Sequence, residues 1–263
     1  MSKPRYRIYP SILDKYQKFL DSDLVAEEFW NRTEDSYKLS PEEMSDKLEQ
    51  ELIDAINRVD KVPSEAADKG TAFNEIIDCI IENKECERED MHIYSILAPE
   101  KEPCVIAQFN GWTFSFDIEL SRRVAAYFAD CIPQYTCSAI LPTSFGDVEL
   151  YGHVDYIGVN KVYDLKTTRD YKFGNYSDYW QRHLYPYCLI ESGDLKEVTE
   201  FEFTVVEWKE LKNKPICGSI FKEVYTYSHE KSKTKLTAIC ESFIGWLEAR
   251  RNLITNEKIF GGE

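Results

Sequence analysis

The sequence predicts an α/β fold in which a central mixed β-sheet is flanked by helices. Helical patterns come first, and β-rich segments then alternate with further helices in an order that is not a regular βαβ series. The chain has 263 residues, of which 43% are hydrophobic and 30% are charged, as expected for a globular protein with a sizeable core. Because no repeat or Gly/Ser linker divides the chain, we expect one domain over residues 1–263, with a helical N-terminal segment over about residues 1–62.

Two helices are expected in this N-terminal segment. The first covers residues 10–20, where apolar residues recur at helical spacing and Ser11 can serve as the N-cap. The second follows Ser40, with Pro41 at the first helical position and Glu43 completing a capping box. The apolar stripe of the second helix is Met44, Leu48, Leu52, Ile56 and Val59.

A third helix is expected to begin near Gly70, and strands follow it. The segments 104–109 and 111–116 are β-rich, and Asn110–Gly111 between them is typical of a tight hairpin turn. The remaining expected elements are a helix over 117–130, a strand over 134–141, two strands within 148–168 joined near Gly158–Lys161, a helix over about 177–191, strands over 198–208 and 219–227, and a helix over about 229–253.

The composition excludes some classes of protein. With 32 basic and 47 acidic residues the net charge is −15, so the whole surface cannot coat nucleic acid, although net charge does not exclude a local basic groove. The chain has no apolar run of about 18 residues that could span a membrane. The N-terminus lacks the apolar segment of a secretory signal, so we expect a cytoplasmic protein without a membrane partner.

The chain contains eight cysteines, and none of them lies in a CxxC or Cys/His pattern with zinc-like spacing. The closest pairs, Cys131/Cys137 and Cys79/Cys86, are six and seven residues apart, wider than the spacing typical of iron–sulfur ligands. We therefore expect reduced thiols and no iron–sulfur cluster.

The chemically informative segment is residues 149–172. Side chains alternate along a strand, so Asp164 and Lys166 point to one face while Leu165 points to the other. A turn between the two expected strands can bring Asp155 beside Asp164. Two adjacent carboxylates repel each other unless a cation lies between them, and hard oxygen ligands suit Mg²⁺ or Mn²⁺. Lys166 would place an ammonium beside that metal, where it can orient or activate a water or stabilise the charge of a phosphorane.

The spacing GxxD…DLK, here Gly152, Asp155, Asp164 and Lys166, resembles the PD-(D/E)XK nuclease superfamily, and more narrowly its RecB-type and phage exonuclease branch. Three further segments are similar to motifs of that branch: Gln181 and Tyr185 match its QxxxY motif, residues 69–78 resemble its GxxxHExxE helix, and residues 8–20 resemble its N-terminal SxS-type helix. The resemblance runs from about residue 8 to 190 through sparse motifs, and it implies a restriction-endonuclease-like fold.

Two positions depart from the family pattern. Asn74 stands where the family has a metal-binding histidine, so the resemblance implies a weak ligand at Asn74 or its replacement by Glu75 or Asp78. Tyr16–Gln17 occupy the Cys-Pro position of the iron–sulfur relatives, and no cysteine triplet follows near the C-terminus. The iron–sulfur version of the family is therefore not expected.

The resemblance also implies roles for individual residues. Asp155 and Asp164 would hold the metal, with the backbone carbonyl of Leu165 as a further oxygen ligand. Lys166 would position or deprotonate the attacking water. The roles implied for Gln181 and Tyr185 are to buttress the site and to touch the DNA backbone.

A basic island lies between Lys161 and His183 in this acidic chain, and it offers Arg169, Lys172 and Arg182 as contacts to phosphates. Aromatic residues that could stack on bases interleave with it, namely Tyr171, Phe173, Tyr176, Tyr179 and Trp180. The alternative interpretation is a loop whose aromatic side chains pack into the core, above all Tyr176 and Trp180.

Each signal has an ordinary structural alternative. A DxK triplet is often a surface ion pair, Gln181 and Tyr185 could be a surface amide and a core aromatic, and Glu75 with Asp78 could form a solvated helix face. The joint order of the motifs favours a divalent-metal-dependent DNase of the phage or recombination exonuclease type, acting on linear double-stranded ends or on single strands.

Two alternative functions stay open. Asn74 favours a non-catalytic nucleic-acid- or protein-binding module that keeps the nuclease scaffold. A site-specific endonuclease would need a recognition element, and neither a helix-turn-helix nor a zinc module is visible. Besides DNA, a recombination or annealing protein and further copies of the chain are candidate partners.

Overall fold

The computed structural model describes residues 4–28, 30–31, 36–37, 39–60, 63–97 and 102–261. Its elements are, in chain order, β1 (Tyr6–Ile8), α1 (Pro10–Leu20), α2 (Ser22–Glu28), β2 (Trp30–Asn31), β3 (Ser36–Tyr37), α3 (Pro41–Ile56), α4 (Glu65–Glu82), β4 (Met91–Ile96), β5 (Cys104–Phe109), β6 (Trp112–Asp117), α5 (Ile118–Tyr127), β7 (Ile132–Thr143), β8 (Gly146–Gly158), β9 (Lys161–Thr168), α6 (Gln181–Glu191), β10 (Glu200–Lys209), β11 (Cys217–Thr226), α7 (His229–Ala249) and the 3-10 helices η1 (Arg251–Leu253) and η2 (Glu257–Phe260).

The main sheet is mixed and has six strands, in the order β1–β8–β9–β10–β11, with β7 also paired to β8. The long strand β8 pairs in parallel with β1 and antiparallel with β7, and its last residues pair with the start of β9. Strands β9 and β10 are parallel, and the connection between them contains α6. A separate antiparallel sheet has three strands, in the order β4–β5–β6. The predicted α/β fold with a central mixed sheet is therefore confirmed.

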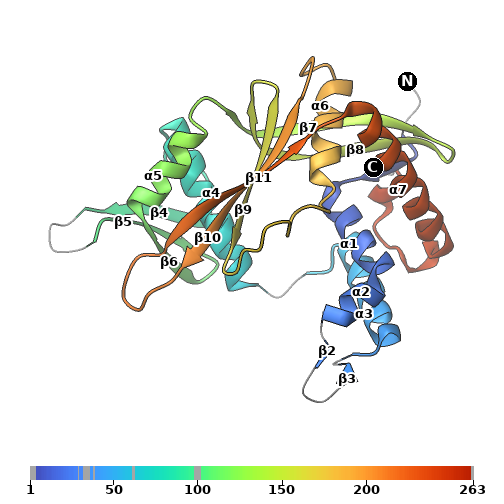
Figure 1. Ribbon diagram of the computed structural model, residues 1–263, viewed down its shortest axis with the longest axis horizontal. Helices are drawn as coiled ribbons and strands as arrows, with labels where there is room; N and C mark the ends of the chain where they lie inside the picture. Colours follow the sequence, from blue (N-terminus) through green and yellow to red (C-terminus); the bar gives the residue numbers. More distant parts are fainter. Residues whose placement is uncertain are drawn as a thin grey trace.

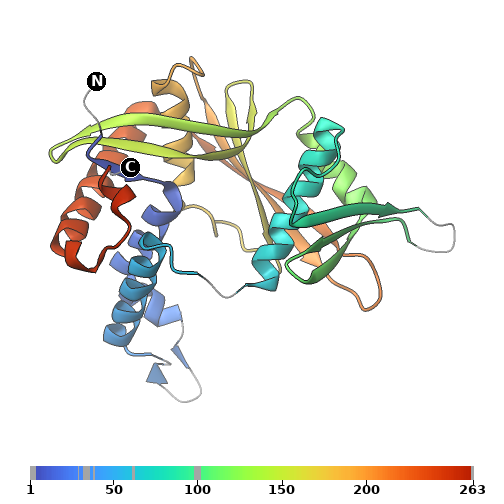
Figure 2. The same cartoon turned by 180° about the vertical axis from the view of Figure 1, so that it is seen from behind.

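Two apolar cores cover the two faces of the main sheet. On one face α1, α3, α6 and α7 pack around Val162, Phe201 and Phe203. On the other face α4, α5 and the small sheet pack around Leu165 and Val206. Figures 1 and 2 show these two groups of elements at opposite sides of the main sheet. Leu165 thus packs toward α4, which confirms the predicted alternation along β9.

Local sequence signals explain several element boundaries. Helix α3 begins with the predicted capping box, in which Ser40 Oγ accepts from the Glu43 backbone and the Glu43 carboxylate accepts from the Ser40 N–H. The β5–β6 hairpin turns through Asn110 and Gly111, whose φ angles are 48° and 82°. Asparagine and glycine both tolerate positive φ, so the tight hairpin turn predicted from this dipeptide is confirmed.

Other boundaries differ from the prediction. Helix α1 starts at Pro10, with Tyr9 and not Ser11 at the N-cap position, because the fixed φ of proline suits the first helical residue. Helix α4 starts at Glu65, so Gly70 lies inside it and not at its start. A Cβ at Gly70 would lie 2.8 Å from Thr167 Oγ1 on β9, so this glycine permits close packing of helix on sheet.

Two strands, β1 and β4, had weak sequence signals, and a third element, helix α6, is shorter than predicted. Strand β1 has only three residues, and β4 is largely exposed, so neither shows a clear pattern. The N-terminal segment is mostly helical but also provides β1 to the main sheet. Helix α6 starts at Gln181, because successive turns occupy the preceding residues, including Gly174 at φ 90°. None of the helices in the described ranges is both long and apolar enough to cross a membrane.

Candidate active site

The predicted acid pair lies in a fork of the main sheet. Strands β8 and β9 pair from Gly158↔Lys161 to Tyr156↔Tyr163, and the next residue on each strand is an aspartate. The backbone pairing of the two strands ends at this point, and the Asp155 side chain takes over, since its Oδ2 accepts the Leu165 N–H at 2.8 Å. The N–H and C=O of one residue point to the same edge of a strand, so the Leu165 carbonyl also faces the fork. The Leu165 carbonyl needs this orientation if it is to serve as an oxygen ligand of the metal.

Asp164 and Lys166 of β9 form a compact polar cluster with Gln181 of α6. Lys166 Nζ lies 2.7 Å from Asp164 Oδ2 and donates to Gln181 Oε1 at 2.8 Å. Gln181 Nε2 donates to Asp164 Oδ1 at 2.7 Å and lies 3.3 Å from the Tyr185 hydroxyl. Asp164 is only 1% exposed, so the alternative of a surface ion pair does not describe this DxK triplet.

The two residues of the QxxxY pattern therefore have different positions. Gln181 contacts both Asp164 and Lys166, whereas Tyr185 lies behind it and is 5% exposed. A Cβ at Gly152 would lie 2.6 Å from the Tyr185 ring, so the glycine of GxxD makes room for this tyrosine. From this position Tyr185 can buttress Gln181. Its burial leaves no exposed ring to touch a DNA backbone, and we retain only the buttressing role.

Electrostatics at the fork reflect a shortage of positive charge. Burial raises the pKa of the Asp155 carboxyl well above its usual range, and the neighbouring charge of Asp164 adds to the shift. Burial opposes the charged form of Lys166, but Asp164 outweighs it and the pKa of the ammonium is raised. One ammonium thus stands against two carboxylates, which leaves a net negative charge for a bound cation to neutralise.

Asp14 on α1 is a third carboxylate near Lys166 that the sequence motifs did not single out. Its Oδ1 accepts the Trp180 N–H at 2.8 Å, which fixes the end of the loop before α6. Burial raises the pKa of Asp14 to about 6, although the charge of Lys166 acts in the opposite direction. The only signal that could have identified it is its position within the segment that resembles the SxS-type helix.

A cavity of about 460 Å³ opens between α4 and the fork, and Asp155 lies in its wall. The other ionisable residues of the wall are Glu75, Asp78, Glu82, Lys84 and Arg88, together with the polar Thr71, Asn74 and Gln134. The structure therefore brings Asn74 and Asp155 to one cavity, as the comparison with the GxxxHExxE helix implied. The Oδ1 atom of Asn74 is buried without a hydrogen-bond partner in the described part of the chain.

Asp78 is the most constrained acid of this cavity. Its carboxylate accepts from the Tyr156 hydroxyl at 2.7 Å and from Gln134 Nε2 at 2.9 Å. Burial raises the pKa of Asp78 to about 6 against these two hydrogen bonds. Tyr156 and Gln134 were not predicted, because neither belongs to a recognisable motif.

The donor atoms fit a hard divalent cation. Asp155, the Leu165 carbonyl and the orphaned Asn74 Oδ1 are all oxygen donors, as Mg²⁺ and Mn²⁺ prefer. A buried amide oxygen without a partner is costly, and a cation is one way to satisfy it. Asp164 Oδ1 accepts from Gln181, and Oδ2 lies 2.7 Å from Lys166 Nζ but has no hydrogen-bond partner in the described part of the chain, so a cation held there would share this carboxylate with Lys166.

The basic candidates for nucleic-acid contacts do not all lie together. Arg169 forms an ion pair with Glu210, and Lys172 is exposed on the loop between β9 and α6. Arg182 instead lies over the Tyr225 ring and lines a different cavity, near the start of α7.

The aromatic residues of this loop also separate into two groups. Phe173 is 84% exposed, while the loop beneath it is held by Glu223, which accepts from the Tyr171 hydroxyl and from the Gly174 N–H. Tyr176 is buried against Phe203, so the interpretation as a core aromatic is confirmed for it.

No protein-family model matches this chain, and no curated protein is similar to it.

Proposed function

We propose that this protein is a divalent-metal-dependent DNA nuclease with a restriction-endonuclease-like fold. The single observation that carries the proposal is the constellation at the fork. Asp155 lies on β8, Asp164 and Lys166 lie on β9, and Gln181 on α6 bonds to the last two. Residues of two strands and one helix thus form one polar cluster, in which Asp164 is buried and the other three side chains are half-buried, and such clusters are common at functional sites.

Asp155, Asp164 and the Leu165 carbonyl would hold the cation, with Asn74 as a weak further donor. A bound Mg²⁺ or Mn²⁺ supplies charge stabilisation to a phosphodiester undergoing hydrolysis. The chain's own part is positioning. Gln181 orients the Lys166 ammonium, and that ammonium can hold an attacking water or stabilise negative charge that develops on the phosphoryl oxygens.

The loop between β9 and α6 supports nucleic acid as the substrate. It covers residues 169–180, between the end of β9 and Gln181 at the start of α6, so it connects two parts of the polar cluster. Its exposed Lys172 can contact a phosphate, and its exposed Phe173 can stack on an unpaired base. These features suit a strand end or a single strand, and we therefore propose an exonuclease of the phage or recombination type.

A non-catalytic binding module is the second candidate, and Asn74 favours it. An amide is a weaker ligand than the histidine implied by the family pattern, so the cation could bind too weakly for turnover. The ion pair of Lys166 with the buried Asp164 argues against this candidate, since a binding module has no need for a half-buried ammonium at a carboxylate pair.

Incubation with end-labelled linear DNA and with circular DNA, each with and without Mn²⁺, tests the proposal. We expect Mn²⁺-dependent release of short labelled products from linear DNA and no cut in the circle. Cleavage of the circle at discrete positions would indicate the site-specific endonuclease. Binding of either DNA without any cleavage would indicate the binding module.

A further inference from the structure

A second cluster of candidate metal ligands lies on the last turns of α4 and in the segment that follows the helix. One of its members, Glu75, also lines the cavity beside the fork. Glu75, Cys79 and Cys86 each offer one ligand atom, and these three atoms all lie within 4.8 Å of one another. Glu75 and Cys79 are one turn apart on the helix. The helix ends at Asn83 in the left-handed conformation, at φ 49°, and the chain then turns back to bring Cys86 to the other two.

The spacing of this cluster matches tetrahedral coordination. With Zn–S and Zn–O bonds of about 2.3 and 2.1 Å, tetrahedral angles place sulfur and oxygen ligands about 3.6 Å apart and two sulfurs about 3.8 Å apart. The Cys86 thiol donates to Glu75 Oε1 at 3.6 Å. Since no pair of ligand atoms exceeds 4.8 Å, side-chain shifts of at most about 1 Å would complete the arrangement.

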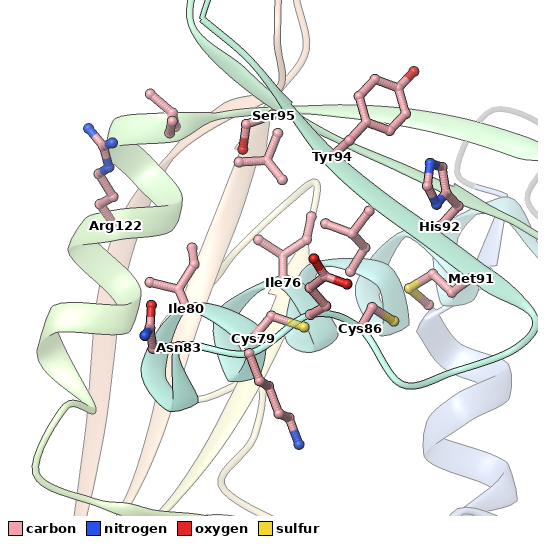
Figure 3. A pocket seen from close by; sticks show the side chains of 15 residues that line it. Ile76, Cys79, Ile80, Asn83, Cys86, Met91, His92, Tyr94, Ser95 and Arg122 are labelled. Carbon is pink, nitrogen blue, oxygen red and sulfur yellow. The ribbon is translucent and has the colours of Figure 1, made fainter.

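The surroundings leave a coordination position open. Burial raises the pKa of the Cys79 and Cys86 thiols, so a cation bound here would have to displace their protons, as metal ligation by thiols does. Cys79 is buried and Cys86 half-buried, beside a cavity of about 630 Å³ that Met91 and His92 also line. Figure 3 shows both cysteine side chains at the same edge of this cavity, where a water or another ligand could take the fourth position.

We propose that Glu75, Cys79 and Cys86 form a binding site for a thiophilic divalent cation such as Zn²⁺. Soft sulfur ligands select this class of cation, whereas the oxygen donors at the fork select Mg²⁺ or Mn²⁺. The bound cation ties the last turns of α4 to the segment that follows the helix. It also engages Glu75, which leaves Thr71, Asn74, Asp78 and Glu82 as the residues of α4 that line the cavity beside the fork.

Cadmium is a direct probe, because thiolate ligation gives it a sulfur-to-metal charge-transfer absorption. The 263-residue chain should show this absorption with one equivalent of Cd²⁺. Cys79→Ser and Cys86→Ser should each weaken Cd²⁺ binding by about tenfold or more, since even supporting residues around a metal contribute this much. Cys131→Ser is the matched control, because Cys131 is also half-buried and lies outside the cluster.

A second measurement uses the unmutated protein and requires no variant to fold. Zn²⁺ should slow the alkylation of Cys79 and Cys86, mapped by mass spectrometry, whereas the rate at Cys131 should not change. Equal alkylation with and without Zn²⁺, or a Cd²⁺ absorption that survives in both serine variants, overturns the proposal. Neither readout depends on DNA cleavage, so failure of the nuclease proposal leaves this test intact.

Discussion

The side-chain amide of Gln181 donates a hydrogen bond to Asp164 over 2.7 Å and thereby joins the first turn of α6 to the buried face of β9. The same amide accepts from Lys166, so one residue orients both the Asp164 carboxylate and the Lys166 ammonium. Side chains that orient metal ligands and reacting groups in this way contribute strongly to activity.

We expect Gln181→Ala to lower the rate of DNA cleavage by about 10–100-fold, the range typical of residues that orient metal ligands. The carboxylates and Lys166 remain, so cleavage should be slowed but not abolished. Cleavage at saturating Mn²⁺ measures this effect, and thermal unfolding of the same variant checks that the fold is kept. A variant that cleaves at the parent rate would show that Gln181 is only a structural link.

Asn74→His should tighten Mn²⁺ binding several-fold and raise the cleavage rate, because imidazole nitrogen is a stronger metal ligand than an amide oxygen. Titration calorimetry with Mn²⁺ measures the affinity. Thr71→His is the matched control, since Thr71 lines the same cavity one turn earlier on α4. If both variants bind Mn²⁺ like the parent, Asn74 is not positioned to contact the cation.

Asp14→Asn should stabilise the metal-free protein at neutral pH. The pKa of Asp14 is about 6 in the folded state, above its ordinary value of 3.8, so the folded protein binds more protons between these values. Stability therefore falls as the pH rises from about 4 to 6, by at most about 3 kcal/mol. The asparagine Oδ1 can still accept the Trp180 N–H, so the substitution removes the charge alone.

Unfolding by denaturant across this pH range measures the effect of Asp14→Asn. The variant and the parent should have equal free energies of unfolding below about pH 4. As the pH rises toward 6, the free energy of unfolding of the variant should exceed that of the parent by a growing amount. A difference that does not vary with pH would show that Asp14 is not a buried charge in the folded state.

Gly152→Ala should destabilise the fold by about 1–3 kcal/mol, because the added Cβ would lie 2.6 Å from the Tyr185 ring. The displaced tyrosine should also disturb Gln181 and slow cleavage. Gly245→Ala provides the control, since a Cβ there meets nothing within 4 Å inside helix α7 and should stabilise by up to about 1 kcal/mol. Denaturant unfolding of both variants distinguishes a steric effect from a general sensitivity to substitution.

Local signals predicted much of this fold. The capping box of α3 and the Asn110–Gly111 turn depend on neighbouring residues only, and both occur as predicted. Asp155 and Asp164 could be placed together because a single hairpin separates them. Alternation along β9 then placed Asp164 and Lys166 on one face.

The rest depended on contacts between distant segments. Strand β1 pairs with β8 across about 140 residues, and three residues carry too little pattern to predict such a partner. Asp14 reaches the cluster only because α1 packs beside the loop before α6. The approach of Glu75 to Cys86 depends on the left-handed turn at Asn83, which spacing alone did not indicate.

The rate of DNA cleavage by Lys166→Ala at saturating Mn²⁺, measured under single-turnover conditions, tests the assignment of the fork most directly. Removing the ammonium leaves Asp155 and Asp164 in place, so binding of Mn²⁺ and DNA should persist. Cleavage should fall by about 10²–10⁴-fold, the contribution of a positioned proton-transfer or charge-stabilising group. In contrast, Asp155→Ala and Asp164→Ala should lose both metal affinity and turnover. Cleavage by Lys166→Ala at the parent rate would contradict the account and leave Lys166 as the structural partner of Asp164.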